Sequence, residues 1–321
     1  MNYFDESTSI DVITDYIKKN TSILIENEIV KKIDSAGEGN MNVVLRIKTN
    51  FKSFILKQSR SHVKRFPQIK APLERIYIEY CFYSLVKKNF FSPNVLGFIN
   101  EDYVLFLEDL IKCRDLNYIY DSRQIDNDKV NKLALILHNI HITKAHKNYP
   151  ANLALRKLNY DHIFVLPFLK DNGLQLNNIQ DGLEELAIPF KENMDIIRRV
   201  NNAGKNYLDR GTTLLHGDYY PGSWMERNEN IYIIDPEFTF LGLKEFDLGV
   251  MSGHLILATG QISYLKKICD NYPDKIDNNE VAIYCAIEII RRLIGYAQLP
   301  IKRSIREKSD LLKLAKELII N

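Results

Sequence analysis

Part of the N-terminal third of the chain shows the two-residue alternation of apolar and polar positions that is typical of β-strands. Apolar side chains occupy every second position over residues 43–47, and a short turn separates them from the apolar run 54–57. Two such runs predict a β-hairpin. The segment 95–110 repeats the pattern around a polar centre at 100–102, so it predicts a second pair of strands.

Apolar residues at helical spacing dominate the rest of the chain. Residues 1–20 predict a helix, and a second helix is expected over about 73–87, between the two hairpins. Beyond residue 108 the helical spacing recurs in the segments 126–146, 278–299 and 304–320. The first of these begins with a capping aspartate. The candidate caps of the N-terminal helix are Ser7, Thr8 and Ser9.

These patterns predict an α+β protein with two lobes. Residues 1–108 would form a small lobe with an antiparallel sheet, and residues 109–321 a mostly helical lobe that contains one short strand near 230–235. We expect ligands to bind in a cleft between the lobes, because clefts of this kind are common binding sites.

Composition and charge exclude several classes of function. The chain has 321 residues, of which 45% are hydrophobic and 26% charged, as in ordinary globular proteins. Its 43 basic and 41 acidic residues leave a net charge of +2, which indicates no general nucleic-acid partner. The four cysteines form no close pair, and no segment resembles a signal peptide or a membrane span. We therefore expect a cytoplasmic protein with reduced thiols and no membrane contact.

Two acidic clusters in the segment 214–238 are the main candidates for chemistry. Asp218 follows a histidine and a glycine after an apolar pair, and Asp235 ends the apolar run 231–234, with Glu237 two residues later. In an extended segment Asp235 and Glu237 would point to the same side and could bind one Mg²⁺ ion together. Asp218 could then accept a proton from a hydroxyl group. The alternative is that these aspartates are turn residues with local backbone hydrogen bonds.

The first lobe contains the residues that a phosphate-binding site would need. Gly37, Gly39 and Asn40 lie in a turn between predicted strands, where backbone N–H groups could approach phosphate oxygens closely, although most such turns only connect a hairpin. Lys57 ends an apolar strand, so it is either a surface residue with a buried stem or a phosphate-binding cation. Two glutamates of the following helical segment could pair with it, Glu79 and Glu74.

The order of these elements resembles the protein-kinase-like folds, in particular the aminoglycoside-phosphotransferase and choline-kinase branch. Within that branch the chain is most similar to the 5-methylthioribose kinases, over about residues 37–297. The stretches that carry the resemblance are "GEGNMNVVLRI", "ILKQS", "FLEDL", "HGDYYPGS", "IDPEFTFLGLKEFDLG" and "IIRRLIGYA".

The resemblance implies a role for each matching residue. Asp218 would be the catalytic base, Asp235 and Glu237 would bind Mg²⁺, and Lys57, paired with Glu79, would contact the phosphates of ATP. The segment from Phe106 to Leu110 would line the adenine pocket as a hinge; its candidate contacts are Leu107, Glu108 and Leu110. The tandem arginines Arg291 and Arg292 match the pair that contacts the sugar in these kinases, although such a pair is also typical of a solvated helix face.

Residues at three positions, and the length of the chain, differ from the patterns of related kinases. Ser223 stands where most related phosphotransferases have an asparagine as a second metal ligand, and methylthioribose kinases share this serine. Tyr219 and Tyr220 replace residues beside the acceptor site, where their rings could stack on a sugar. The chain is also shorter than usual for the family, so a different pentose or small alcohol remains an alternative acceptor.

We therefore expect an ATP- and Mg²⁺-dependent kinase whose partner is a small sugar with an acceptor hydroxyl, and a homodimer is an open alternative to a monomer. An aminoglycoside or other small-alcohol phosphotransferase is the second candidate, but polycationic antibiotics would require acidic contacts rather than Arg291 and Arg292. A nucleotide-binding pseudokinase is the third, and it predicts the loss of Lys57, Asp218 or Asp235, all of which are present.

Overall fold

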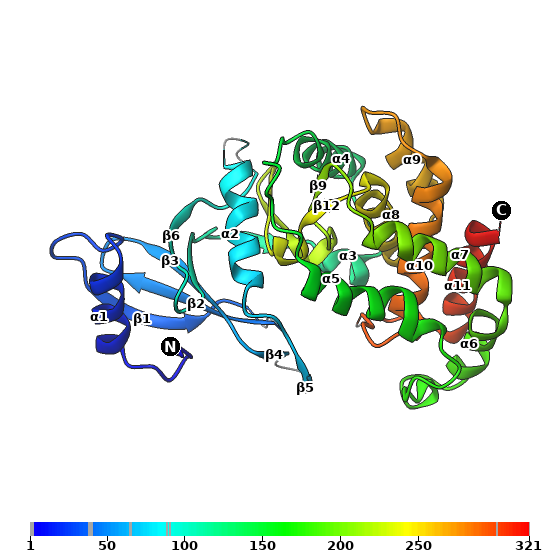
Figure 1. Cartoon of the computed structure of the whole chain (residues 1–321), viewed down its shortest axis with the longest axis horizontal. Helices are drawn as coiled ribbons and strands as arrows, with labels where there is room; N and C mark the ends of the chain where they lie inside the picture. The colour runs from blue at the N-terminus through cyan, green and yellow to red at the C-terminus, as the bar shows by residue number, and fades with distance from the viewer. Residues whose placement is uncertain are drawn as a thin grey trace. The chain divides into compact units, whose positions relative to one another are not determined.

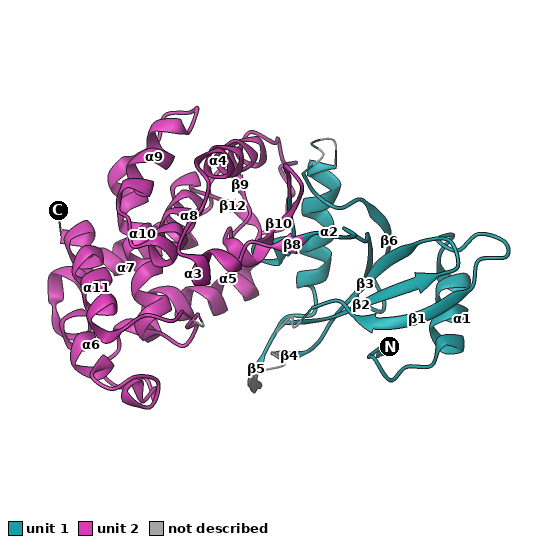
Figure 2. Ribbon diagram, turned by 180° about the vertical axis from the view of Figure 1, so that it is seen from behind, with its two compact units in different colours: residues 1–113, 232–238 teal, residues 114–231, 239–321 magenta. Residues whose placement is uncertain are grey.

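The computed structural model describes residues 3–37, 41–63, 66–87, 89, 91–299 and 301–320, with the side chains of residues 63 and 66–69 left out. The chain divides into two compact units (Figure 2). Unit 1 comprises Met1–Cys113 and Tyr232–Phe238, and unit 2 comprises Arg114–Ile231 and Thr239–Asn321. The chain therefore leaves unit 1 five residues after the expected boundary at 108, and it returns to unit 1 for a short segment.

A five-stranded antiparallel sheet forms the centre of unit 1, and Figure 1 labels its strands β1, β2, β3 and β6. The order of the strands is β1-β2-β3-β7-β6. Its strands are β1 Val30–Ser35, β2 Asn42–Thr49, β3 Ser53–Ser59, β6 Val95–Ile99 and β7 Val104–Glu108. Both predicted hairpins are present, β2 with β3 and β6 with β7. Leu45 pairs with Leu56 and Ile47 with Phe54, and all four side chains are buried, which explains the two-residue alternation. The short strands β4 His62–Val63 and β5 Phe66–Lys70 form a separate pair.

Two helices complete unit 1, α1 Ile10–Asn20 and α2 Arg75–Val86. The apolar side of α1, with Ile13, Tyr16 and Ile17, belongs to the same buried cluster as the sheet residues. Ser9 caps this helix by accepting a hydrogen bond from the Val12 amide at 3.4 Å. The predicted start of the helix near residue 1 is wrong, because the Asp5 carboxylate accepts bonds from the amide and hydroxyl of Ser7 and holds a turn instead.

Helices make up most of unit 2, together with two small sheets. The helices are α3 Tyr118–Ser122, α4 Asn127–His141, α5 Leu153–Tyr160, α6 Leu183–Glu192, α7 Met194–Leu208, α8 Lys244–Thr259, α9 Ser263–Asn271, α10 Asn278–Ile294 and α11 Ile305–Ile320. Short single turns are η1 Asp161–Val165, η2 Leu166–Phe168, η3 Leu176–Asn178 and η4 Pro221–Ser223, with η5 Pro236–Phe238 in unit 1. The strands are β8 Arg114–Asp115, β9 Thr213–Leu215, β10 Trp224–Arg227, β11 Asn230–Ile233 and β12 Phe240–Gly242. Among these, the sequence predicted β11, and the apolar residues before the His-Gly-Asp run also suited the short strand β9.

Helices α8 and α10 pack against each other at very short range in the core of unit 2. A Cβ atom added to Gly249 would lie 2.4 Å from Tyr284 Cβ and 2.9 Å from the backbone nitrogen of Cys285. A Cβ atom added to Gly253 would lie 2.9 Å from Glu288 Cβ. The two glycines of α8 therefore allow the close approach that brings Glu288 of α10 beside α8.

The cysteines and the helices agree with the general expectations from composition. Cys81, Cys113, Cys269 and Cys285 all carry free thiols. Within the described part of the chain, none of the helices combines the length and the apolar character needed to cross a membrane.

The close contact of α8 with α10 predicts that Gly249→Ala destabilises unit 2. Overpacking a core costs up to about 3 kcal/mol, which exceeds the gain of roughly 1 kcal/mol from replacing a helical glycine by alanine. We expect a net loss of about 2 kcal/mol, measured by urea unfolding. Gly37→Ala is the matched control, because a Cβ atom there meets nothing within 4 Å. Equal unfolding midpoints for the two variants would contradict the prediction.

Candidate active site

A buried lysine links three segments of unit 1. The Lys57 amine, on β3, lies 2.8 Å from Glu79 Oε1 of α2 and 2.5 Å from Asp235 Oδ1 of the returning segment. The side chain of Lys57 is only 4% exposed, so its charge requires these carboxylates as partners. Burial lowers the pKa of Lys57, but Asp235, Glu79 and Glu237 outweigh burial and raise it above its usual value, which keeps the amine protonated.

The geometry distinguishes the two glutamates that could have paired with Lys57. Glu79 is fully buried, and both of its carboxylate oxygens lie within 2.8 Å of the amine. Glu74 precedes α2 and is exposed. Burial raises the pKa of Glu79 to about 7, and Lys57 opposes this shift. Glu79 is therefore a carboxylate that depends on the lysine for its charge.

The segment with Asp235 and Glu237 is not extended, so the expected same-side arrangement of the two carboxylates is wrong. Asp235 adopts a left-handed backbone conformation with φ 60°, and residues Pro236–Phe238 form a 3₁₀ turn. The amide of Asp235 donates to the Tyr83 hydroxyl at 3.1 Å, and the amide of Ile233 donates to the Phe91 carbonyl at 2.7 Å. These bonds attach the segment to unit 1.

Glu237 has its own partners, which the sequence did not indicate. Asn42 Nδ2 donates to Glu237 Oε2 at 2.9 Å, and Arg75 Nε lies 3.3 Å from the same oxygen. Burial raises the pKa of Glu237, while Lys57 and Arg75 lower it. Arg75 stands one helical turn before Glu79 on the buried side of α2. That spacing of an arginine and a glutamate within an apolar helix was the signal that sequence analysis missed.

The carboxylates of unit 1 fit a magnesium ion bound together with phosphate. In the part of the chain that the structure describes, three of them, Glu79, Asp235 and Glu237, form ion pairs with the two cations Lys57 and Arg75, so three negative charges share two positive ones there. The side chain of Asp235 is 54% exposed and can reach a ligand. Among the described residues no three or more His, Cys, Asp or Glu side chains form a complete metal cage. Mg²⁺ typically needs only one or two carboxylates when phosphate and water supply its other ligands.

A buried aspartate of α8 holds the His-Gly-Asp loop of unit 2. Asp247 accepts hydrogen bonds from the amides of His216 at 2.7 Å and of Gly217 at 3.0 Å. Gly217 has φ +86°, a conformation that favours glycine, and the chain turns there so that Asp218 follows. His141 Nε2 lies 3.3 Å from Asp247 Oδ2. The sequence stretch "IDPEFTFLGLKEFDLG" contains Asp247 but gives no indication that this residue holds the loop.

The carboxylate of Asp218 faces the two tandem arginines of α10. Asp218 Oδ1 lies 3.4 Å from Arg292 Nη2 and 3.6 Å from Arg291 Nη2. Both arginine side chains are at most 10% exposed, whereas that of Asp218 is 24% exposed. The interpretation of the pair as a solvated helix face is therefore wrong: both guanidinium groups point inward to Asp218 and to the buried carboxylate of Glu288, 2.5 and 2.7 Å from their Nε atoms.

Two residues of this loop that the sequence suggested as ligand contacts, Tyr219 and Ser223, are buried and make other contacts. Tyr219 is fully buried, its hydroxyl donates to the Leu133 carbonyl at 2.9 Å, and its ring packs near Trp224, so it is a core residue. Ser223 is 1% exposed, and its hydroxyl donates to the Tyr220 carbonyl at 2.8 Å. The same oxygen accepts from the Tyr220 amide at 3.2 Å. Ser223 therefore closes the turn after Asp218 and is not placed as a metal ligand.

Tyr220 lies differently from its neighbour. Its side chain is half-buried, and the guanidinium group of Arg292 lies over its ring, 5.4 Å from the centroid. A Cβ atom on Gly222 would lie 2.4 Å from the Tyr220 hydroxyl, so the glycine allows the ring to fold over the turn. Tyr220 remains a candidate for contact with the acceptor.

The other expected nucleotide contacts lie partly outside the described residues. Gly39 and Asn40 are not described, whereas Gly37 is exposed two residues after the end of β1. Leu107 and Leu110 are buried, and Glu108 accepts from Asn94 Nδ2 at 2.7 Å. Their contact with an adenine base stays a prediction.

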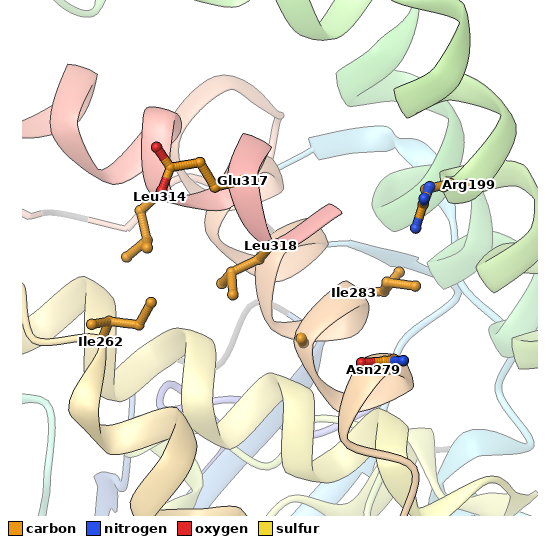
Figure 3. A pocket seen from close by; sticks show the side chains of 8 residues that line it. Arg199, Ile262, Asn279, Ile283, Leu314, Glu317 and Leu318 are labelled. Carbon is orange, nitrogen blue, oxygen red and sulfur yellow. The ribbon is translucent and has the colours of Figure 1, made fainter. Parts of the chain in front are cut away.

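A separate hollow in unit 2 shares no residue with these clusters (Figure 3). It has a volume of about 310 Å³ and lies among α7, α10 and α11, with Ile283, Leu314 and Leu318 as its apolar lining. Arg199 and Glu317 lie at its edges. Asn279 lines it at the start of α10, roughly 18 Å of helix before Arg291, so the hollow is not part of the Asp218 cluster.

Comparison with solved structures defines the class of fold. The choline kinase of Streptococcus pneumoniae matches 96% of this chain and 98% of its own, with a TM-score of 0.55 and 15% identity. Spectinomycin phosphotransferase in complex with ADP and spectinomycin matches 98% of both chains, with a TM-score of 0.52 and 14% identity. The chain thus has the protein-kinase-like fold of choline kinases and aminoglycoside phosphotransferases, as the sequence predicted.

Sequence comparison identifies more particular relatives. The chain is 29% identical to methylthioribose kinase from Exiguobacterium sibiricum over 253 residues, which are 73% of this chain and 63% of the relative. It is 25% identical to methylthioribose kinase from Escherichia coli over 259 residues, 71% of this chain and 58% of the relative. The resemblance to methylthioribose kinases is confirmed, and the chain spans less than two thirds of these curated relatives. No protein-family model matches the chain.

The buried histidine of α8 predicts a specific pH dependence of stability. Burial lowers the pKa of His254 from 6.5 to about 4, although the nearby Glu288 opposes this shift. Between these values the unfolded chain binds more protons than the folded one, so stability is full above pH 6.5 and falls as the pH decreases towards 4. The unfolding free energy of the wild type minus that of His254→Gln should decrease by about 3 kcal/mol over this range.

Chemical unfolding at several pH values measures this difference. His146→Gln, at an exposed position of the same unit, serves as the control and should show no such trend. A difference for His254→Gln that stays constant from pH 6.5 to 4 would show that the histidine is not held neutral.

Proposed function

We propose that this protein is an ATP- and Mg²⁺-dependent kinase that transfers the γ-phosphoryl group to a hydroxyl group of a small sugar, with 5-methylthioribose or a related pentose as the acceptor. The observation that carries the proposal is the buried Lys57 between Glu79 and Asp235. A charged lysine with two carboxylates in unit 1 provides what a triphosphate and a divalent cation require.

The residues of unit 1 would bind the nucleotide and its metal. Lys57 would contact phosphate oxygens while Glu79 holds the amine in place, and Asp235 with Glu237 would hold Mg²⁺. When bound, the ion would neutralise charge on the phosphates. AMP and ADP are present in solved structures that share the fold, which supports a nucleotide as a ligand of this protein. The hydrogen bond from Asn42 and the ion pair with Arg75 would fix the orientation of the Glu237 carboxylate.

The residues of unit 2 would bind and activate the acceptor. Asp218 would accept a hydrogen bond from the reacting hydroxyl and take its proton as the new P–O bond forms. Asp247 would keep the backbone of this loop in position through its bonds to His216 and Gly217. Arg291 and Arg292 would donate to oxygen atoms of the sugar, with the ring of Tyr220 beside them.

The charges around Asp218 favour a neutral acceptor over a polycationic one. This cluster contains two arginines and two carboxylates, Asp218 and Glu288, so its positive and negative charges balance. A polyhydroxylated sugar can pair with guanidinium donors without adding charge. A polycationic antibiotic would place positive charge against Arg291 and Arg292, so we rank an aminoglycoside acceptor below a sugar.

The direct test is ATP consumption by the purified protein with 5-methylthioribose, other pentoses, choline and aminoglycosides, each with and without Mg²⁺. We expect turnover with a thiosugar or pentose that depends on Mg²⁺, and no turnover with aminoglycosides. Phosphorylation of choline or an aminoglycoside, with none of any sugar, would refute the proposed acceptor class.

Asp218→Asn should separate catalysis from nucleotide binding. Loss of the proton acceptor should lower kcat by about 10²–10⁴-fold, the usual contribution of a general base. The affinity for Mg²⁺-ATP, measured by titration calorimetry, should remain within about twofold, because the nucleotide contacts that we propose lie in unit 1. Asp235→Ala should give the converse result, with loss of the Mg²⁺ dependence of ATP binding. Full turnover by Asp218→Asn would show that the assigned role is wrong.

A further inference from the structure

Glu288 is a buried carboxylate that contacts both arginines of the acceptor site. It lies on α10, one turn before the pair, and it is 1% exposed. Arg291 Nε lies 2.5 Å from Glu288 Oε2, and Arg292 Nε lies 2.7 Å from Glu288 Oε1. Each carboxylate oxygen therefore binds one arginine, and the same two oxygens fix the positions of both guanidinium groups.

The bonds to Glu288 determine which atoms of the arginines remain for a ligand. Glu288 takes the Nε atoms, and the Nη2 atoms of both arginines point to Asp218, at 3.6 and 3.4 Å. Burial by itself would raise the pKa of Glu288, but the two arginines lower it well below its usual value. Glu288 is thus a permanent carboxylate, and it can hold two guanidinium groups side by side that would otherwise repel each other.

Two further buried residues, His254 and Tyr120, extend the network of contacts from Glu288 in the direction away from the arginines. His254 Nε2, on α8, lies 2.8 Å from Glu288 Oε1, and His254 Nδ1 lies 2.6 Å from the hydroxyl of Tyr120 on α3. His254 is fully buried and Tyr120 is 6% exposed. The contact between His254 Nε2 and Glu288 Oε1 is short but lacks the alignment of a hydrogen bond. Because a carboxylate has no proton to donate, this contact places the histidine proton on Nε2, and the Tyr120 hydroxyl is then the donor to Nδ1.

We propose that Tyr120, His254 and Glu288 form a positioning chain that fixes the orientation of Arg291 and Arg292 and thereby sets the affinity for the acceptor. The inference rests on the proposed function for its substrate. Tyr120 holds the tautomer of His254, His254 holds Glu288, and Glu288 holds the two arginines. A ligand-binding group is only as well placed as the side chains behind it, so loss of a distant member loosens the site.

The contacts of this positioning chain differ from those of an ion pair that only stabilises the fold. A purely structural pair would be satisfied by Glu288 and one arginine, whereas here the carboxylate binds two adjacent arginines and one Nη2 atom of each faces Asp218. Helices α8 and α10 approach each other so closely that a methyl carbon added at Gly253 would lie 2.9 Å from Glu288 Cβ. This close approach places His254, the next residue of α8, beside the carboxylate.

Tyr120→Phe tests the positioning chain at the residue that is farthest from the arginines. The change removes the donor to His254 Nδ1 and leaves Glu288, Arg291 and Arg292 unaltered. We expect KM for the acceptor to rise about tenfold, the low end of what loss of an outer partner costs at metal sites. KM for ATP should stay within about twofold, because the nucleotide contacts proposed lie in unit 1.

Tyr284→Phe is the matched control. Tyr284 lies in the same unit, is as deeply buried as Tyr120, and its hydroxyl donates to the Ala203 carbonyl at 3.1 Å without contacting either arginine. It loses one buried hydrogen bond, as Tyr120→Phe does, so it should cost similar stability and leave acceptor KM unchanged. Equal effects of the two variants on acceptor KM would overturn the inference.

A measurement without substrate keeps the two proposals apart. In nitrogen-15 NMR spectra of the wild type, restricted rotation about Cζ–Nε should give separate Nη resonances for Arg291 and Arg292. Glu288→Gln and Tyr120→Phe should merge these resonances, whereas Glu280→Gln, at another position of α10, and Tyr284→Phe should not. Averaged resonances in the wild type, or unchanged resonances in Tyr120→Phe, would overturn the positioning chain. A wild type that phosphorylates no sugar but shows the predicted spectra would refute the proposed function alone.

Discussion

The buried amine of Lys57 is the interaction on which the arrangement of unit 1 depends. It joins the central strand β3, helix α2 and the segment Tyr232–Phe238, three parts of the chain that are far apart in sequence. A charged amine that is 4% exposed is very unfavourable without partners, so Glu79 and Asp235 have to be present together. This requirement explains why the chain returns to unit 1 after more than a hundred residues.

The clusters of charged residues in the two units differ in net charge. This difference agrees with the ligands that we propose for each unit. In unit 1 three carboxylates face two cations, Lys57 and Arg75, which favours a divalent cation. Around Asp218 two arginines and two carboxylates balance, which favours a neutral polyol. In each cluster a buried carboxylate fixes the cations that we expect to contact the ligand: Glu79 fixes Lys57 in unit 1, and Glu288 fixes the two arginines in unit 2.

Much of the fold could be predicted from the sequence, because strand and helix periods are local properties of the chain. Both hairpins of unit 1 and the mostly helical remainder follow from them, whereas the kinase-like class was indicated by the resemblance that motifs such as the one around Asp218 carry. The backbone at Asp235 could not be predicted, since its left-handed conformation depends on bonds to α2 and neighbouring residues. Burial of Tyr219 depends on Trp224 and the Leu133 carbonyl, and the contact of His254 with Glu288 depends on the packing of α8 on α10. Tertiary contacts of this kind leave no periodic signal.

Our main proposal is that Lys57, held by Glu79, binds the phosphates of the nucleotide and that Asp235 binds the metal ion. A crystal structure of the protein with Mg²⁺ and a non-hydrolysable ATP analogue tests it most directly. The account predicts that Lys57 keeps its contact with Glu79, exchanges the carboxylate of Asp235 for a phosphate oxygen, and leaves Asp235 bound to the ion. A nucleotide bound elsewhere, with the contact between Lys57 and Asp235 unchanged from the present 2.5 Å, would contradict it.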